Sequence, residues 1–252
     1  MFETEVPEGM TVPFLAGVKK MPHPYILTPP LDNGRNYPEG AELTLGLSLF
    51  GDTAKMLPFF IYSFQQMGQA GIGYARKKFR LMQVMLIGED DNKTELFNDI
   101  YRSLADEVAP VLVGAPTEEP APPKVTLRFL TPWRAQENAR ILTRAEEVTP
   151  ELLINAASRR FLVMESLYGQ MPPPEEPPDC SGITISENKL RFADWERYSN
   201  RQQTKMSMGG FMGEITLEGN LAPVWKWLKA GEYIHIGKNA AFGLGKYEIK
   251  TD

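Results

Sequence analysis

Two histidines and a lysine-flanked glycine loop are the residues of this 252-residue chain whose types and spacing could do chemistry. A histidine can accept and donate a proton near neutral pH, so His235 and His23 are candidates for general acid–base work. His235 stands two residues before Gly237, where the loop begins, and Lys238 and Lys246 stand at its rims. Successive backbone N–H groups in such a loop, with lysines beside them, favour an anion such as phosphate.

The loop from Gly237 to Gly245 also fits a tight structural connection, because only glycine reaches positive φ without strain. It lacks both GxGxxG after a strand and GxxxxGK[ST], so neither a dinucleotide-binding fold nor a P-loop is supported. For His235, pairing with a neighbouring carbonyl is as good an interpretation as catalysis. For His23 the structural interpretation is favoured.

The elements that would position the loop are marked by changes of hydrophobic period. Residues 214–218 alternate apolar and polar, which predicts a strand with one buried face. Residues 220–229 change to spacings of three and four, which predicts a helix that Gly231 would end. Residues 233–236 alternate again, which predicts a strand with its histidine on the sheet face opposite the helix. Residues 246–250 predict a last strand.

Earlier in the chain a similar order of elements occurs. Alternation over residues 43–49 predicts a strand, and residues 58–67 predict a helix that begins at a proline. A glycine-rich connection over residues 68–73 precedes a strand over residues 79–87, and a short helix is expected over residues 94–104. This loose repetition indicates two related units.

A proline-rich stretch separates these elements from those of a second unit. Residues 114–123 (GAPTEEPAPP) are a linker by composition. Alternation over residues 124–129 predicts the first strand of the second unit, and Thr149 and Pro150 open a helix that Gly169 ends. The second unit is therefore ordered βαββαβ.

Composition bounds the class of protein. The formal net charge is −5, which argues against indiscriminate nucleic-acid binding. Residues 1–123 carry −6, residues 124–187 carry −2 and residues 188–252 carry +3, so the positive charge falls where the glycine loop lies. Cys180 is the one cysteine, which excludes an internal disulfide. With no signal-like start and no long apolar run, we expect a cytoplasmic protein.

The glycine-rich end resembles the C-terminal signature of the CRISPR-associated RAMP superfamily, and most closely its precursor-crRNA-processing endoribonucleases. The resemblance covers nearly the whole chain, and the C-terminal block is the most specific. It rests on residues 23–30 (HPYILTPP), 67–73 (MGQAGIG), 197–203 (RYSNRQQ) and 237–249 (GKNAAFGLGKYEI).

The resemblance implies an α+β fold of two ferredoxin-like (βαββαβ, RRM-like) units in tandem. The first would occupy residues 1–118, and the second, with the glycine loop, residues 119–252. Family members usually carry a further segment before a stretch like Met1–Thr4, which supplies the first strand and helix. We therefore expect the first unit to be incomplete, whether the true start lies upstream or the protein is shortened.

The resemblance also implies a function. The chain would bind CRISPR repeat RNA and cleave precursor crRNA through attack of the 2′-OH on the adjacent phosphate, with no metal or other cofactor. The alternative is a non-catalytic crRNA-binding RAMP subunit of a CRISPR effector complex, and a small-ligand enzyme is distant because no cofactor motif supports it. The expected partners are repeat RNA, crRNA and other CRISPR-associated subunits, without a membrane.

The candidate site residues follow from this implied function, although no family motif assigns catalysis to either histidine here. His235 is the leading catalytic candidate, with His23 and Tyr25 as secondary ones. Spaced charges are usually a solvated face, so the basic candidates and the run from Arg76 to Arg80 depend on the resemblance. Trp225 and Trp227 are expected to pack within a helix. The RNA-binding candidates are Gly237, Lys238, Phe242, Gly243, Gly245, Lys246, Arg197, Arg201 and Gln202.

Overall fold

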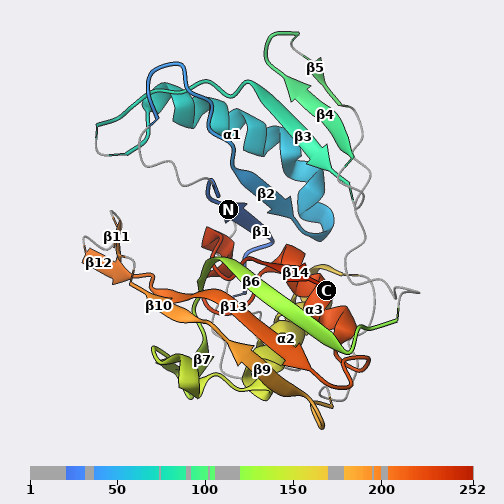
Figure 1. Ribbon diagram of the computed structural model, residues 1–252. Helices are drawn as coiled ribbons and strands as arrows, with labels where there is room; N and C mark the ends of the chain where they lie inside the picture. Colours follow the sequence, from blue (N-terminus) through green and yellow to red (C-terminus); the bar gives the residue numbers. More distant parts are fainter. Residues whose placement is uncertain are drawn as a thin grey trace. The chain divides into compact units, whose positions relative to one another are not determined.

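The computed structural model describes most of the chain as two compact units (Figure 1). The larger unit comprises residues 1–49 and 113–252, and the smaller unit comprises residues 50–112. The predicted boundary between residues 118 and 119 lies outside the described residues and stays a prediction. The described residues are 21–31, 37–73, 75–88, 92–101, 103–105, 120–169, 179–194, 196–199 and 204–251.

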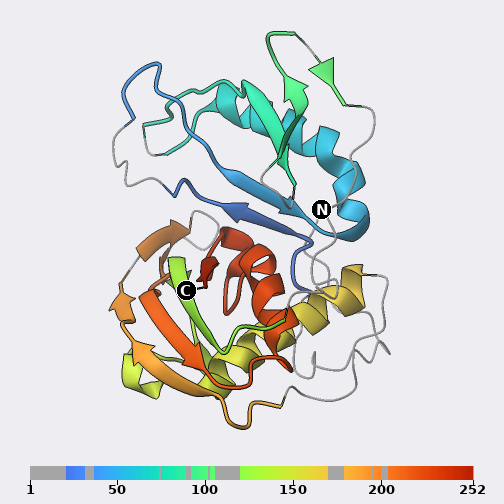
Figure 2. The same cartoon turned by 45° about the vertical axis from the view of Figure 1, so that its right-hand side comes forward.

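A five-stranded antiparallel sheet with two helices forms the body of the larger unit. Its strands lie in the order β10–β13–β6–β14, and β9 pairs with β13 beside β10. Figures 1 and 2 show α2 and α3 together on one side of this sheet. With β9 and β10 counted as one interrupted strand, this is βαββαβ, as predicted. The elements are β6 (Lys124–Trp133), α2 (Pro150–Tyr168), β9 (Thr184–Asn188), β10 (Arg191–Ala193), β13 (Gly210–Glu218), α3 (Trp225–Ile234) and β14 (Tyr247–Lys250).

The structure confirms two of the local sequence patterns that predicted these elements, the alternation in β6 and the start of α2. In β6 every second residue from Val125 to Trp133 is buried, which is the period of a strand with one face on a core. The hydroxyl of Thr149 accepts a hydrogen bond from Leu152 N at 3.2 Å, and Pro150 occupies the first turn, so α2 begins where a cap and a proline coincide.

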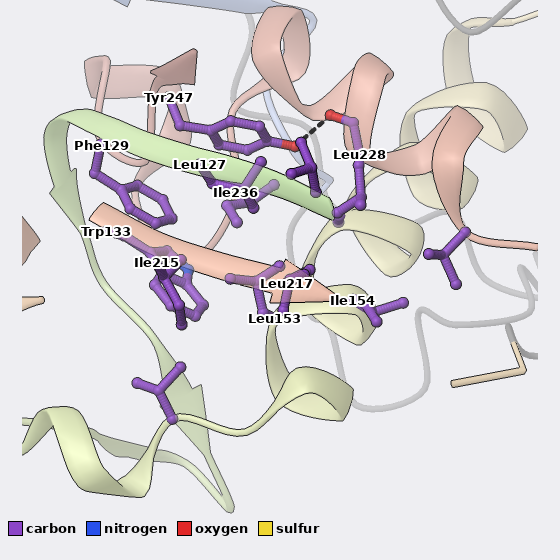
Figure 3. Close-up of a cluster of buried hydrophobic side chains, with 14 of the residues drawn as sticks. Leu127, Phe129, Trp133, Leu153, Ile154, Ile215, Leu217, Leu228, Ile236 and Tyr247 are labelled. Atoms are coloured by element: carbon purple, nitrogen blue, oxygen red, sulfur yellow. Dashed lines mark hydrogen bonds between the residues drawn. The ribbon is translucent and has the colours of Figure 1, made fainter. Parts of the chain in front are cut away.

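Aromatic rings fill the core between the sheet and its helices (Figure 3). Phe129 and Trp133 stack with ring centroids 5.0 Å apart, and Tyr247 meets Phe129 edge-on at 5.5 Å. The Tyr247 hydroxyl donates to the carbonyl of Leu228, which ties β14 to α3. These contacts fix the last strand against the last helix, and the glycine loop joins the two.

The predicted strand over residues 233–236 is wrong, because α3 continues to Ile234. Gly231 does not end the helix. A Cβ at this position would lie 2.0 Å from the Tyr247 hydroxyl oxygen, so the glycine instead makes room for that side chain. The helix ends at His235, whose φ of 55° lies in the left-handed region.

A short antiparallel pair joins the larger unit from the N-terminal side. It consists of β1 (Tyr25–Thr28) and β2 (Gly46–Leu49), so the predicted strand over residues 43–49 is confirmed in its second half. β1 packs against η3 (Ala240–Phe242), a turn within the glycine loop. The remaining elements of the larger unit are β7 (Gln136–Glu137), β8 (Arg140–Ile141), η2 (Ala145–Glu147), β11 (Glu196–Ser199) and β12 (Thr204–Ser207).

The smaller unit combines one helix with a three-stranded antiparallel sheet. The predicted helix over residues 58–67 is confirmed as α1, but the helix expected over residues 94–104 is wrong. β4 pairs with β3 there, and Asn98 Oδ1 accepts from the backbone N–H groups of Ile100 and Tyr101, which forms a turn. The elements are η1 (Gly51–Met56), α1 (Leu57–Ala70), β3 (Gln83–Ile87), β4 (Lys93–Asn98) and β5 (Ser103–Leu104).

Across the described part of the chain, the helices fall short of the length and apolarity that a membrane span needs.

Candidate nucleic-acid interface

The glycine loop is anchored to the end of β6 by one buried hydroxyl. Thr131 is 4% exposed. Its Oγ1 donates to the carbonyl of Gly243 at 2.7 Å and accepts from the backbone N–H of Lys246 at 2.9 Å. Gly245 N donates to Pro132 O at 3.0 Å. The return half of the loop is therefore held to the core sheet before any ligand binds.

Three glycines of the loop are required by packing within the protein. Gly243 has a φ of 82°, and a Cβ there would lie 2.4 Å from the carbonyl oxygen of Leu27 in β1. At Gly245 the corresponding distance to Ile236 O is 1.8 Å, and at Gly237 it is 2.7 Å to Trp133 Cδ1. The structural interpretation of the loop is thus confirmed for these positions.

Much of the loop backbone already has hydrogen-bond partners. The N–H of Lys238 donates to Arg134 O at 3.1 Å, that of Phe242 to Asn239 O at 3.0 Å and that of Gly243 to Ala240 O at 2.8 Å. In this conformation these N–H groups are not available to cradle a phosphate. The side chains of Lys238 and Phe242, both exposed, are instead the parts of the loop that face solvent.

His235 does not lie on an open sheet face, so its predicted placement is wrong. The residue is 1% exposed, and among the described residues its Nδ1 has no hydrogen-bond partner. Burial lowers the pKa of His235 to about 3, and the nearby Lys246 and Arg160 add to the effect. The ring is therefore neutral at neutral pH. Its catalytic role stays a prediction, and it would require a conformation in which the ring is accessible.

The two secondary candidates lie together beside the loop. His23 and Tyr25 stack with ring centroids 5.2 Å apart, and both are partly exposed. Tyr25 is the first residue of β1, the strand that packs against η3 in the glycine loop, and His23 stands two residues before it. Among the predicted catalytic residues, these two combine a ring contact with access to solvent.

Lys246 differs from Lys238 in its surroundings. Lys246 is partly buried, and burial lowers the pKa of its amine, while the carboxylates of Glu232 and Glu248 oppose that shift. Burial also raises the pKa of Glu232, whose Oε1 accepts from Ile249 N at 2.7 Å. The amine of Lys246 therefore lies in a partly buried cluster with the carboxylates of Glu232 and Glu248, and not on the outer surface of the loop.

The sheet face that points away from α2 and α3 carries paired charges. Arg128 lies 3.2 Å from Glu248 and 3.9 Å from Glu214, and Lys250 lies 2.8 Å from Glu214. These pairs join three adjacent strands, and they neutralise one another. The face therefore offers less attraction to phosphate than the net charge of residues 188–252 suggests.

The remaining predicted residues are only partly accounted for. Arg197 lies on β11, but its side chain lies outside the described part of the structure, as do Arg201 and Gln202 altogether. Trp225 and Trp227 are 8% and 5% exposed, so the prediction that they pack is confirmed. Within the described ranges, no three His, Cys, Asp or Glu side chains form a group that could hold a metal ion.

Two family models match parts of this sequence. Residues 127–247 match the model of the family described as CRISPR-associated endoribonuclease Cas6. Those residues belong to the Cas6-type family. The match runs from β6 to β14 and includes the whole glycine loop, which confirms the resemblance given by the sequence. Residues 1–111 match a second model, described as an N-terminal domain.

One curated relative spans most of the chain. It is an uncharacterized protein from Archaeoglobus fulgidus, 23% identical over 237 residues, and the alignment covers 90% of this chain and 73% of the relative. The alignment is long enough to include residues of both units, and the relative's description names no activity.

Solved structures support the same fold. A Cas6 product complex aligns over 94% of this chain and 89% of its own, with a TM-score of 0.55 and 14% identity. A Thermus thermophilus Cas6 product complex aligns over 90% of this chain and 82% of its own, with a TM-score of 0.55 and 17% identity. Another Thermus thermophilus Cas6 structure aligns over 53% of this chain and 55% of its own, with 18% identity and a TM-score of 0.39, and the fold assignment does not rest on it. The predicted α+β, ferredoxin-like fold class is confirmed.

Proposed function

We propose that the chain binds CRISPR repeat RNA and processes precursor crRNA. The observation that carries the proposal is the Cas6-type match of residues 127–247 on a complete βαββαβ unit. The solvent-facing loop side chains, Lys238 and Phe242, lie in the same unit as the His23–Tyr25 pair. A cation that can bind phosphate, an aromatic side chain that can stack on a base and the stacked histidine–tyrosine pair suit a single-stranded RNA ligand.

Cleavage would need no metal. A base removes the proton from the 2′-OH, the 2′-oxygen bonds to the adjacent phosphorus, and the bond from phosphorus to the 5′-oxygen breaks. The leaving oxygen takes a proton, so the products end in a 2′,3′-cyclic phosphate and a 5′-OH. We assign proton transfer to His23, because its ring is partly exposed. Tyr25 orients that ring, and Lys238 stabilises charge that develops on the phosphate.

Two observations favour the alternative, a non-catalytic crRNA-binding subunit. The most buried histidine, His235, is neutral, and many loop N–H groups are already paired. A non-catalytic subunit would bind RNA through side chains on the loop surface and would leave the phosphodiester bond intact. The two candidates therefore differ in cleavage and agree in binding.

The test compares variants on a labelled repeat RNA in EDTA. His23→Ala is expected to abolish cleavage and keep binding, whereas Tyr25→Phe, which preserves the ring contact, should retain most of the rate. His235→Asn should cleave if the protein folds. A 2′-deoxy nucleotide at the cut site should block the reaction. Loss of cleavage in His235→Asn with full activity in His23→Ala would reverse the assignment of the two histidines.

A further inference from the structure

Arg134 is a buried cation with no acidic partner among the described residues. It directly follows β6 and is 8% exposed. Its Nη1 donates to the carbonyl of Gly209 at 2.9 Å, and its Nε is buried without a partner. Burial lowers the pKa of Arg134, and no neighbouring carboxylate opposes that shift. The guanidinium is still charged at neutral pH, so the described residues hold a positive charge near the loop with no carboxylate beside it.

Such a placement is costly for the free protein. A buried charge is normally paired, and a single carbonyl offsets only part of the lost hydration. An uncharged side chain of similar length would fill the same space without that cost. The arginine is therefore better explained by something that binds it than by the stability of the unliganded fold.

Two glycine-containing segments converge on this residue. A Cβ at Gly210 would lie 2.9 Å from Arg134 N, and a Cβ at Gly237 would lie 2.8 Å from Arg134 O. Lys238 N donates to that same oxygen at 3.1 Å. The backbone of the exposed Lys238 is thus fixed next to that of Arg134. Because the two glycines have no side chains, their backbone segments can approach Arg134 closely.

We propose that Arg134 and Lys238 together bind one phosphate of the RNA backbone. The proposal rests on the proposed function, because it takes RNA as the ligand. A guanidinium presents N–H donors in a planar fork that matches two phosphate oxygens, and the bond from Nη1 to Gly209 fixes the plane of that fork. Lys238 meets the same phosphate from the solvent side. Arg134 is a binding residue in this account and takes no part in proton transfer.

The test measures binding of a labelled repeat RNA across a series of salt concentrations. Each phosphate contact adds about 0.7 to the slope of log affinity against log salt for a single strand. Arg134→Gln and Lys238→Ala should each lower that slope and weaken binding at fixed salt, by about 10- to 100-fold for the arginine, since charge-assisted hydrogen bonds are lost. The matched control is Lys189→Ala, which removes an exposed lysine paired with Glu187 at 2.7 Å and should change neither quantity.

The outcomes separate this inference from the proposed function. If the wild type binds RNA and a folded Arg134→Gln keeps its affinity and slope, the inference is overturned and the function stands. If Arg134→Gln does not fold, the exposed Lys238→Ala decides in the same way. If the wild type does not bind RNA, the proposed function is wrong. The anion site can then still be tested with inorganic phosphate as the ligand. Phosphate that raises the melting temperature of the wild type but not of Lys238→Ala supports an anion site, and no rise in the wild type overturns it.

Discussion

Lowering the pH from 7 to 5 should destabilise the larger unit through His235. The pKa of this residue is lowered from 6.5 to about 3 in the folded protein, because the ring is buried beside two cations. Between those pKa values the unfolded chain binds a proton that the folded chain does not. The stabilisation by neutral His235 is therefore fully present above pH 6.5 and is lost as the pH falls toward 3.

The magnitude follows from the width of that window. Each unit of pH between the two pKa values changes the free energy of unfolding by about 1.4 kcal/mol. A fall from pH 6.5 to pH 5 therefore costs about 2 kcal/mol, and the full shift costs on the order of 5 kcal/mol at pH 3. Even the smaller value is a large share of the stability of an ordinary domain.

Tryptophan fluorescence during urea denaturation measures this effect in the larger unit alone. All four tryptophans of the chain lie in residues 113–252. The control is His235→Asn, since asparagine tolerates the positive φ and does not titrate. Other groups, such as Glu232, act equally in both proteins, so the difference isolates His235. An equal pH dependence in wild type and variant, within about 0.5 kcal/mol, would refute the burial of a neutral ring.

Two further predictions concern the way the loop is held. Gly243→Ala should destabilise the larger unit by about 2–4 kcal/mol, because it combines positive φ with a Cβ that would lie 2.4 Å from Leu27 O. Gly182→Ala, where φ is 74° and no atom lies within 4 Å of the added Cβ, should cost about 1 kcal/mol, and equal losses in urea denaturation would contradict the close approach of β1. Thr131→Val should cost about 1–3 kcal/mol, since Gly243 O and Lys246 N both lose their partner. A thermally unchanged Thr131→Val protein would show that the hydroxyl does not anchor the loop.

Most of the second unit could be predicted from the sequence because its signals are local. The alternation in β6 and β13 and the Thr149–Pro150 start of α2 each depend on neighbours within a few residues. The same local reasoning found α1 in the smaller unit. Where the spacing of the apolar residues repeats over enough of the chain, the face that these residues share is the face that the fold buries.

The end of α3 could not be predicted because its cause lies elsewhere in the chain. A glycine after a helical pattern ordinarily signals a stop, but Gly231 accommodates the hydroxyl of Tyr247, sixteen residues later. With the helix extended to Ile234, the histidine that follows turns inward instead of standing on an open sheet face. One long-range contact thus changed the surroundings of the leading catalytic candidate.

Arg134 also escaped sequence analysis, for a related reason. An arginine after a strand is usually a solvated charge, and no local pattern marks it as buried. Its burial depends on segments around Gly209 and Gly237, which are distant from it in sequence. The glycines that cluster at those two places were the available signal, because they permit a backbone to approach closely.

Cleavage of a labelled CRISPR repeat RNA by the wild-type chain in EDTA, under single-turnover conditions, tests the central claim most directly. A repeat RNA should be cut at one position to products with a 2′,3′-cyclic phosphate and a 5′-OH, and a shuffled RNA of equal length should remain intact. Tight binding of the repeat without cleavage would contradict the processing reaction and favour the RNA-binding subunit. Failure to distinguish the repeat from the shuffled RNA would contradict a role in CRISPR RNA processing.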